Sequence, residues 1–393
     1  MSNKPKLTTE ETEKILFLRD EFQPEGLSPF LNDDFTLLKW LRQYKMNVEA
    51  AAVKLRQHIA YRKLLDLDRD DAEQLPLDEW LSRVWPSAHL GTESKEGCPV
   101  VIRLAGKVDI DGSLNTIKTS TYIQNELNTC ERRHRLLQKK SLELGRPVGI
   151  CLILDLEGLH FDPRNVSLIN SYFKPLEDFI IGENYPGIEE RIILINAPKL
   201  LASIYALLRS FWPSIHVHIF NHDYRSALTE LVAADQLPER YGGTLKDEQL
   251  AQPIIEPIKV QPEDYYNPDD DPTNTFPIQV RARTKQRLRL KEPLAKGTKM
   301  AWIFKGDHDI GFGIYKLNVL KEKEVMVVPK HRSKADLVPE SGEYEVTEDG
   351  VFAVDFCNAH SRITWKNLMV WLEVTTPDGE KVEWTTTEMP SYP

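Results

Sequence analysis

Apolar residues at the start of the chain recur every three or four positions, which is the period of one helix face. Thr8 and Glu11 have the spacing of a capping box, in which each side chain binds a free backbone N–H of the first helical turn. Asn32–Asp34 and Asn47 can cap two further helices. The pattern predicts a small helical cap over residues 1–75.

The pattern changes after Pro99 to short, continuously apolar runs. These runs lie at 100–102, 150–156, 192–195 and 217–220. Helical segments separate them, at 116–144, 163–181 and 200–211, and a further helix is expected at 223–235. Strands that are buried on both faces have this composition, and their alternation with helices is typical of a largely parallel sheet. We expect an α/β domain over residues 76–246.

The last third of the chain has a different period. Residues 247–275 contain five prolines and no periodicity, which is typical of a linker. Beyond it, apolar residues occupy alternate positions, as at Phe352, Val354, Phe356, Leu368, Val370, Leu372 and Val374. Alternation of this kind predicts an all-β sandwich over 276–378, with a tail at 379–393. We interpret Ser341–Gly342 and Asp349–Gly350 as turns.

Charge narrows the range of partners. The formal net charge is −10, and nucleic-acid binding requires a basic surface, so we expect no nucleic-acid partner. The helical cap is locally basic, and Lys39, Arg42 and Lys45 are candidates for contact with an anionic membrane. The alternative is an ordinary solvated helix surface.

Several classes of protein are not indicated. The longest apolar runs, near Val148–Leu156, fall well short of the ~20 residues that a membrane helix requires. The polar N-terminal residues lack the apolar centre of a secretory signal, so we expect a cytoplasmic protein that associates with membranes transiently. The four cysteines show no C-x-x-C spacing, which favours reduced, buried thiols over a disulfide or a zinc site.

The sequence contains few patterns that indicate catalysis. It lacks the G-x-S-x-G, P-loop, H-E-x-x-H and G-x-G-x-x-G motifs. His216 and His218 are two apart on an expected strand and could chelate a metal jointly, or they are ordinary histidines at a strand end. Asp155 and Glu157 follow an apolar strand, where α/β folds place ligands, or they cap a loop. We expect no catalytic residue, no metal and no cofactor.

One segment is apolar on more than a single helix face. Its apolar residues are Leu200, Leu201, Ile204, Tyr205, Leu207, Leu208, Phe211 and Trp212. Such a helix is either fully buried or in contact with something apolar that is not protein. Enclosing an acyl chain of about 16 carbons is worth on the order of 12 kcal/mol, so a lipid carrier needs a gate that opens at a membrane.

Nine short motifs follow one another in a characteristic order along the chain. In the first two domains they are Phe35–Arg42, Glu96–Val100, Leu154–Leu159, Glu183–Pro186, Ala197–Leu200 and Asp235–Gly243. In the last domain they are Gly311–Ile314, Leu337–Gly342 and Gly350–Asn358. In order and spacing these motifs resemble the CRAL-TRIO lipid-binding family, and within it the members that carry a C-terminal GOLD domain.

The resemblance implies one lipid held between the apolar helix, which acts as a gate, and the floor of the sheet. For this floor we predict the strand residues Ile102, Leu104, Leu152, Leu154, Ile193 and Ile195. The resemblance also implies that the GOLD domain is an interaction or trafficking module. Two departures from the family pattern matter: Gly187 replaces an acid after Tyr185–Pro186, and the segment before His216 is shorter. In relatives that transfer phosphatidylinositol, the second region supplies a threonine and a lysine for the headgroup. Neither residue can be matched here, which argues against phosphatidylinositol and favours a less polar lipid.

Three hypotheses follow. The first is a carrier that binds one hydrophobic lipid and exchanges it at membranes. The second is a trafficking adaptor that binds protein partners through the GOLD domain, with the lipid as a regulatory ligand. The third is an enzyme that uses Asp155, Glu157, His216 or His218. The apolar segment 200–212 and the resemblance to the CRAL-TRIO family together favour the first.

Overall fold

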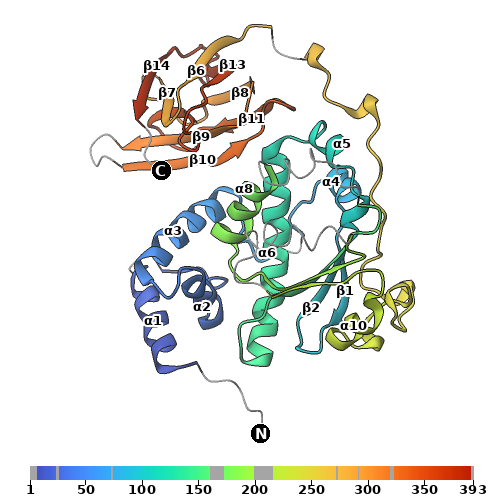
Figure 1. Cartoon of the computed structure of the whole chain (residues 1–393). Coiled ribbons are helices and arrows are strands. Elements are labelled where there is room, and N and C mark those ends of the chain that lie inside the picture. Colours follow the sequence, from blue (N-terminus) through green and yellow to red (C-terminus); the bar gives the residue numbers. More distant parts are fainter. Residues whose placement is uncertain are drawn as a thin grey trace. The chain divides into compact units, whose positions relative to one another are not determined.

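The computed structural model describes residues 7–23, 26–71, 74–159, 172–198, 216–270, 273–290, 292–318 and 323–390. The chain forms two compact units (Figure 1). The first comprises residues 1–110 and 125–259, and the second comprises residues 111–124 and 260–393. The second unit thus includes a short segment that precedes most of the first unit's sheet in the sequence, in addition to the C-terminal sandwich.

The helical cap has the starts that the sequence predicts. Its helices are α1 (Thr9–Asp20), α2 (Asp34–Gln43) and α3 (Val48–Leu64). Thr8 and Glu11 form the capping box, while Asp33 and Asn47 each accept a hydrogen bond of 2.9 Å from a backbone N–H of the first turn. Leu18, Leu37, Leu38, Leu41 and Leu55 are fully buried in the core of this bundle. The caps are confirmed because they depend only on residues next to each other in sequence.

The sheet of the first unit has the order β1-β2-β3-β4-β5. Its strands are β1 (Ala88–Glu93), β2 (Pro99–Arg103), β3 (Ile150–Asp155), β4 (Glu189–Ile195) and β5 (His216–Ile219). Strand β1 pairs antiparallel with β2, and the other neighbours are parallel. The prediction of a largely parallel α/β sheet is confirmed.

Helices connect and flank these strands (Figure 1). They are α4 (Glu79–Val84), α5 (Ile110–Leu114), α6 (Thr119–Leu144), α8 (Lys174–Glu177), a π-helical continuation at Asp178–Asn184, and α10 (Tyr224–Leu231). Short helical turns lie at Ala105–Lys107, Ala234–Gln236, Glu239–Tyr241, Asp247–Gln249, Pro262–Asp264 and Pro268–Asp270. Among the described residues, no helix combines the length and the apolar character that crossing a bilayer requires.

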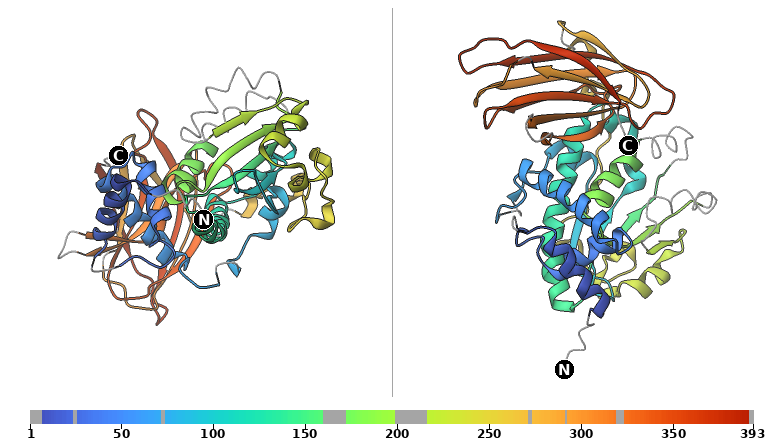
Figure 2. Two further views of the ribbon diagram at one scale, coloured as in Figure 1. Left: turned by 90° about the horizontal axis from the view of Figure 1, so that it is seen from below. Right: turned by 90° about the vertical axis from the view of Figure 1, so that its left-hand side faces the viewer.

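The second unit contains two antiparallel sheets stacked face to face (Figure 2, right). Its strands are β6 (Phe276–Val280), β7 (Thr284–Leu290), β8 (Lys299–Gly306), β9 (Ile310–Asn318), β10 (Lys323–Ser333), β11 (Glu340–Glu345), β12 (Val351–Cys357), β13 (Lys366–Thr375) and β14 (Trp384–Pro390). The sheet orders are β10-β9-β12-β7-β14 and β11-β8-β13-β6. Phe304, Phe312 and Phe356 pack in the core with ring centroids 4.8 to 5.5 Å apart. The predicted sandwich is confirmed.

Two details of the predicted sandwich are wrong. Ser341 and Gly342 lie inside β11 and pair with β8, so they form no turn. A Cβ atom at Gly342 would lie 2.5 Å from the Trp302 ring, and the glycine therefore serves the packing of an indole. The expected tail contains β14, which pairs with β7 from Trp384 to Pro390 and extends the sandwich beyond residue 378.

Candidate functional site

Strand pairing divides the side chains of the first unit's sheet between two faces. Directly paired residues of a parallel sheet point to the same side, and consecutive residues point to opposite sides. Arg103 pairs with Leu154, and Leu154 pairs with Leu194, so these three share one face. Arg103 also contacts Glu126 of α6, with 3.1 Å between Nη2 and Oε2. We call this side the α6 face.

The opposite side packs against the segment that follows α10, and we call it the Tyr241 face. The Tyr241 hydroxyl donates to Asp155 Oδ2 at 3.3 Å, and Asn196 Nδ2 donates to Asp155 Oδ1 at 2.8 Å. Asp155 also accepts the backbone N–H of Glu157 at 3.0 Å. Asp155 is buried, whereas Glu157 is exposed in the turn after β3, so the two carboxylates do not form a site. Asp155 instead ties the ends of β3 and β4 to the Tyr241 segment.

The predicted pocket floor is divided between the two faces, and this prediction needs correction. The pairing places three of the six residues on the Tyr241 face, namely Ile102, Ile193 and Ile195. Leu152 and Leu154 lie on the α6 face, and Leu104 follows the end of β2. The six residues cannot line one cavity, because consecutive strand residues alternate in direction and the register from Cys151 to Asp155 is unbroken.

Charged side chains gather at the α6 face, and we call them the acid–arginine cluster. They are Arg103 of β2, Glu126 and Arg133 of α6, Glu177 of α8, and Glu189 of β4. Burial and the neighbouring Glu189 charge raise the pKa of Glu177 to about 8, against the opposing effect of Arg103. Burial likewise raises the pKa of Glu189 and lowers that of Arg133. The cluster therefore holds a proton at neutral pH.

The acid–arginine cluster is mostly buried but keeps some accessible surface. Glu177 and Arg133 are surrounded deeply by protein, yet both side chains keep accessible surface, as does Leu154 beside them. Within the described part of the chain, Glu189 Oε2 is buried without a hydrogen-bond partner. Groups of this kind line an internal space and retain the capacity to bind a polar group.

A second set of charged groups joins the helical cap to α6 and to the segment before β4, and we call it the cap network. Arg62 forms a bidentate pair with Glu131, at 2.6 and 3.0 Å. Glu131 also accepts from Arg135 Nε at 2.5 Å and from the Tyr185 hydroxyl at 3.0 Å. Arg62 and Glu131 have no exposed side-chain surface. Here each carboxylate oxygen has a donor, and the pKa of Glu131 falls to about 2 because the arginine charges outweigh the cost of burial.

The motif Glu183–Pro186 is explained by the cap network. Glu183 pairs with Lys54 at 3.0 Å, Asn184 Oδ1 lies 3.1 Å from His58 Nδ1, and Tyr185 binds Glu131. A cavity between them has a volume of only about 10 Å³, which is room for about one water. Burial, with the Arg62 charge, lowers the pKa of His58 to about 3, so its ring is neutral at physiological pH. The motif attaches the cap to the sheet and does not form a ligand site.

Gly187 and Lys39 depend on each other. Gly187 has φ +68°, and a Cβ there would lie 3.0 Å from Lys39 Cγ, so the acid found here in the resembling family does not fit this backbone. Lys39 Nζ donates to the Val148 carbonyl at 2.7 Å, and burial lowers its pKa to about 8. Lys39 therefore does not contribute to a surface patch, which corrects that part of the prediction. Arg42 pairs with Glu11 at 2.8 Å, and both Arg42 and Lys45 are exposed, so their contact with a membrane stays a prediction.

Among the described residues, the histidine candidates are not brought together with further metal ligands. His216 is exposed, and His218 Nε2 lies 2.8 Å from Arg191 Nη1. His222 Nδ1 lies 3.3 Å from Asn196 Oδ1. An arginine beside His218 repels a cation, and its charge together with burial lowers the pKa of His218. These residues act as local hydrogen-bonding partners at the strand ends.

One carboxylate–thiol group in the described residues has the spacing of a metal site: Glu96, Cys98 and Glu190. Arginines occupy it. Arg191 binds both oxygens of Glu96, at 2.7 and 2.8 Å, and Arg146 binds Glu190 at 2.9 Å. Burial raises the pKa of the Cys98 thiol to about 11, which disfavours the thiolate a metal needs. All four cysteines are buried and unbridged, as the sequence predicts.

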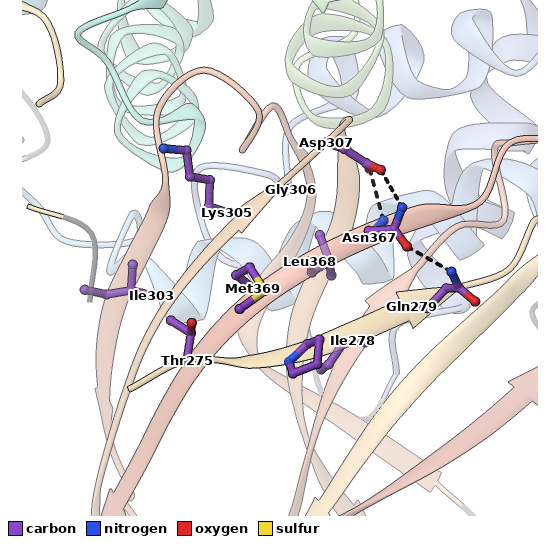
Figure 3. A pocket seen from close by; sticks show the side chains of 11 residues that line it. Thr275, Ile278, Gln279, Ile303, Lys305, Gly306, Asp307, Asn367, Leu368 and Met369 are labelled. Carbon is purple, nitrogen blue, oxygen red and sulfur yellow. Dashed lines mark hydrogen bonds between the residues drawn. The ribbon is translucent and has the colours of Figure 1, made fainter. Parts of the chain in front are cut away.

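The second unit has a groove of about 750 Å³ on the outer side of the β11-β8-β13-β6 sheet. Figure 3 shows a ladder of polar side chains along it, in which Asn367 donates to Asp307 through both nitrogens and accepts from Gln279 at 2.9 Å. Lys305 of this groove lies 5.6 Å from the Tyr266 ring. The polar groups of the ladder bind one another, and Met369 beside them is half exposed.

The model of the CRAL/TRIO domain matches residues 89–243. These residues carry a CRAL/TRIO domain. The match contains β1 to β5 and α6, and hence the acid–arginine cluster and Glu131, while the helical cap and the sandwich lie outside it.

Relatives extend this likeness to different degrees. Protein ctg-1 of Caenorhabditis elegans is 27% identical over 368 residues, which is 88% of this chain and 92% of that protein. A CRAL-TRIO domain-containing protein of the same organism is 26% identical and covers 58% of this chain and 57% of its own length. The phosphatidylinositol/phosphatidylcholine transfer protein SFH4 of Arabidopsis thaliana is 26% identical, over 56% of this chain and 36% of that protein. This chain thus spans between about a third and nearly all of the length of its relatives.

Among solved structures, the crystal structure of Sfh5 aligns with 64% of this chain and 94% of its own, with a TM-score of 0.40 and 14% identity. The apo structure of the PbXyn10C carbohydrate-binding module aligns with 30% of this chain, with a TM-score of 0.22 and 11% identity.

The gate residues predicted for the CRAL/TRIO domain lie outside the described residues. They are Leu200, Leu201, Ile204, Tyr205, Leu207, Leu208, Phe211 and Trp212. The gate therefore stays a prediction from the sequence.

Sequence reasoning missed the charged groups of the CRAL/TRIO domain. One signal was present: Arg103 directly follows the apolar run Val100–Ile102 on a strand, and Glu189 opens the apolar strand β4. A charge at the edge of an apolar strand predicts a partner across the sheet or on the covering helix. The sequence could not identify that partner, because Arg103 is 23 residues from Glu126. The same holds in the cap network, where Arg62 and Glu131 are 69 residues apart.

Proposed function

We propose that this chain binds one hydrophobic lipid on the α6 face of its CRAL/TRIO domain and exchanges that lipid at membranes. The match of residues 89–243 to the CRAL/TRIO domain carries the proposal. The name of SFH4, a phosphatidylinositol/phosphatidylcholine transfer protein, supports transfer as the activity. We also propose that the protein works in the cytoplasm and associates with membranes transiently.

The geometry of the α6 face supports a lipid as the ligand. Leu152 and Leu154 supply apolar surface, and Leu154 keeps part of it accessible. The acid–arginine cluster beside them offers donors from Arg103 and Arg133 and a protonated Glu177. An apolar surface with a few converging polar groups suits an amphiphile with a small polar head.

We further propose that the apolar segment 200–212 is the gate. A lipid enclosed by protein leaves for water slowly, so exchange needs an apolar element that contacts the bilayer. Phe211 and Trp212 carry aromatic rings, which favour the headgroup boundary.

Two measurements test the carrier. Native mass spectrometry of the full chain, followed by lipid extraction, should find about one lipid per protein, and a fluorescent lipid should move between vesicles. Replacing Phe211 and Trp212 with Ser should slow this transfer, while the matched change Tyr265→Ser, at a 38% exposed aromatic elsewhere, should not. A protein that carries no lipid and transfers none would refute the proposal.

The second candidate is an adaptor that binds partners through the C-terminal sandwich, which we propose to be a GOLD domain. Its separate aromatic core favours this role, because such a unit can present loops independently of the CRAL/TRIO domain. Deleting Phe276–Pro393 should then abolish partner binding and change localisation. Unchanged binding and localisation would exclude the adaptor.

A further inference from the structure

Two loops at one end of the sandwich are fixed to each other by backbone hydrogen bonds. The first connects β6 to β7 and the second connects β12 to β13. Asn358, which is fully buried, donates from its amide to the carbonyls of Val280 and Thr364, at 3.1 and 2.9 Å. Its backbone N–H donates to Thr284, and its carbonyl accepts from Arg283 N–H. The loops therefore form one preorganised element, which we call the tip.

The tip holds two apolar side chains in the solvent. Ile363 is 87% exposed and Trp365 is 49% exposed. Ser361 and Thr364 close the turn around Ile363, with 3.0 Å from the Ser361 hydroxyl to the Thr364 carbonyl and 3.0 Å from Thr364 N–H back to the hydroxyl. The hydrogen-bonded turn therefore holds the Ile363 side chain in an exposed position.

The tip is also basic. Residues 281–285 and 358–366 contain no acid and six basic residues, namely Arg281, Arg283, Lys285, His360, Arg362 and Lys366. Lys285 pairs with Asp355, while Lys366 and His360 contact Asp309, which also binds Arg332. The three arginines are exposed, and Arg281 lies over the Trp365 ring at 5.4 Å. One exposed acid, Asp307 on the β8–β9 loop, does not cancel this excess.

Backbone strain marks the same place. Arg283 has φ +61°, a conformation that favours glycine or asparagine. Glycine would fit this turn with less strain than Arg283 does. The Arg283 side chain is exposed, and its loop is bonded to the loop that carries Trp365. Strain of this kind concentrates at functional positions.

We propose that the tip docks the second unit on an anionic lipid surface, with Ile363 and Trp365 inserted at the headgroup boundary and the arginines against lipid phosphates and carboxylates. Tryptophan and arginine both favour this boundary, and each arginine near an anionic surface raises affinity about fivefold. Two apolar side chains are too small a patch for a stable protein interface, whereas a bilayer requires no shape complementarity. This docking does not depend on which lipid the CRAL/TRIO domain holds.

Sedimentation of the full chain with phosphatidylcholine vesicles, with and without phosphatidylserine, tests the proposal. The double change Ile363→Ser with Trp365→Ser should lower binding about tenfold or more. The change Arg283→Glu with Arg362→Glu should abolish the dependence on phosphatidylserine. Val325→Ser, at a 58% exposed residue of β10, and Lys296→Glu, in the β7–β8 loop at the opposite end of the sandwich, are the matched controls and should leave binding unchanged.

A label at the tip gives an independent readout. The four native cysteines are buried, so Ile363→Cys can be labelled selectively with an environment-sensitive dye. Its emission should rise on vesicles that contain phosphatidylserine. Unchanged emission, or double variants that bind vesicles like the unmodified protein, would overturn the proposal. The bound lipid found by extraction should be the same in all tip variants, which separates this test from that of the carrier.

Discussion

The first unit contains two clusters of acids and arginines with opposite character. In the cap network, Glu131 receives donors from Arg62, Arg135 and Tyr185, and the adjoining cavity measures about 10 Å³. In the acid–arginine cluster, Glu177 holds a proton and Glu189 keeps an oxygen without a partner among the described residues. The acids of the cap network have all their hydrogen bonds made, whereas an acid of the acid–arginine cluster does not.

The difference separates structure from function. A buried ion pair that makes all its hydrogen bonds can only attach one element to another, because it has no donor or acceptor left for a ligand. A raised carboxyl pKa and an unpaired buried oxygen both reduce the stability of the fold. Groups of this kind are found most often where a ligand binds. We therefore assign the cap network to attachment of the helical cap and the acid–arginine cluster to the lipid site.

Breaking the cap network should have the largest effect. Glu131→Gln leaves Arg62 and Arg135 buried beside a neutral amide, and loss of one partner of a buried pair costs about 3–5 kcal/mol of the free energy of unfolding. Urea unfolding measures it. The control Glu126→Gln, whose carboxylate lies 3.1 Å from Arg103 and keeps 13% of its side chain exposed, should cost less than Glu131→Gln. Equal losses would contradict the distinction between the clusters.

The two clusters should respond to pH in opposite directions. The folded-state pKa of Glu131 is about 2, below the ordinary 4.5, so its contribution is present above pH 4.5 and is lost as pH falls toward 2. The folded-state pKa of Glu177 is about 8, so its contribution is full below pH 4.5 and is lost as pH rises to 8.

Thermal unfolding across this range checks both signs. Glu177→Gln should reduce the decline in stability between pH 4.5 and 8 and leave the acid limb unchanged, because an amide cannot ionise. The remaining decline comes from Glu189, whose pKa burial also raises. A decline of unchanged size in this variant would mean that Glu177 is ionised in the folded protein.

A change beside the cap network that leaves its charges intact should have a smaller effect. Gly187→Ala places a Cβ 3.0 Å from Lys39 Cγ on a backbone with φ +68°, at a cost of about 1–2 kcal/mol in the free energy of unfolding. Gly182→Ala is the control, because its Cβ would meet only Gln43 at 3.6 Å. Urea unfolding should show a loss for the first variant alone, with the bound lipid unchanged in both. Equal losses would show that the positive φ is not the cause.

The smallest effect is expected from an ion pair at the surface. Arg42 contacts Glu11 at 2.8 Å with 55% of its side chain exposed. Arg42→Ala should cost under about 1 kcal/mol, because water and salt screen an exposed pair. A double-mutant cycle with Glu11→Ala in urea measures the pair directly, and a coupling as large as that of Glu131 would contradict the role of burial.

The sequence predicted what local chemistry decides. Thr8, Asp33 and Asn47 cap helices because each cap and its N–H donor are three residues apart. Likewise, Phe352, Val354 and Phe356 enter the sandwich core through the strand period alone. These features require no knowledge of distant partners.

Distant pairing decided what the sequence did not predict. The predicted floor mixed two faces because the direction of Ile102 relative to Leu152 depends on strand register. Glu131 looked like one charge among many on α6, and its role follows from Arg62, which is 69 residues away. Gly342 suggested a turn because nothing nearby in sequence indicates the Trp302 ring over it.

The central claim is that the α6 face, and not the Tyr241 face, holds the lipid. It is tested most directly by lipid extraction and native mass spectrometry of two variants compared at equal folded fraction: Leu154→Trp, which fills space on the α6 face, and Ile153→Phe, which enlarges the neighbouring side chain on the Tyr241 face. The account predicts that Leu154→Trp loses the bound lipid while Ile153→Phe retains it. Retention by Leu154→Trp together with loss by Ile153→Phe would contradict it.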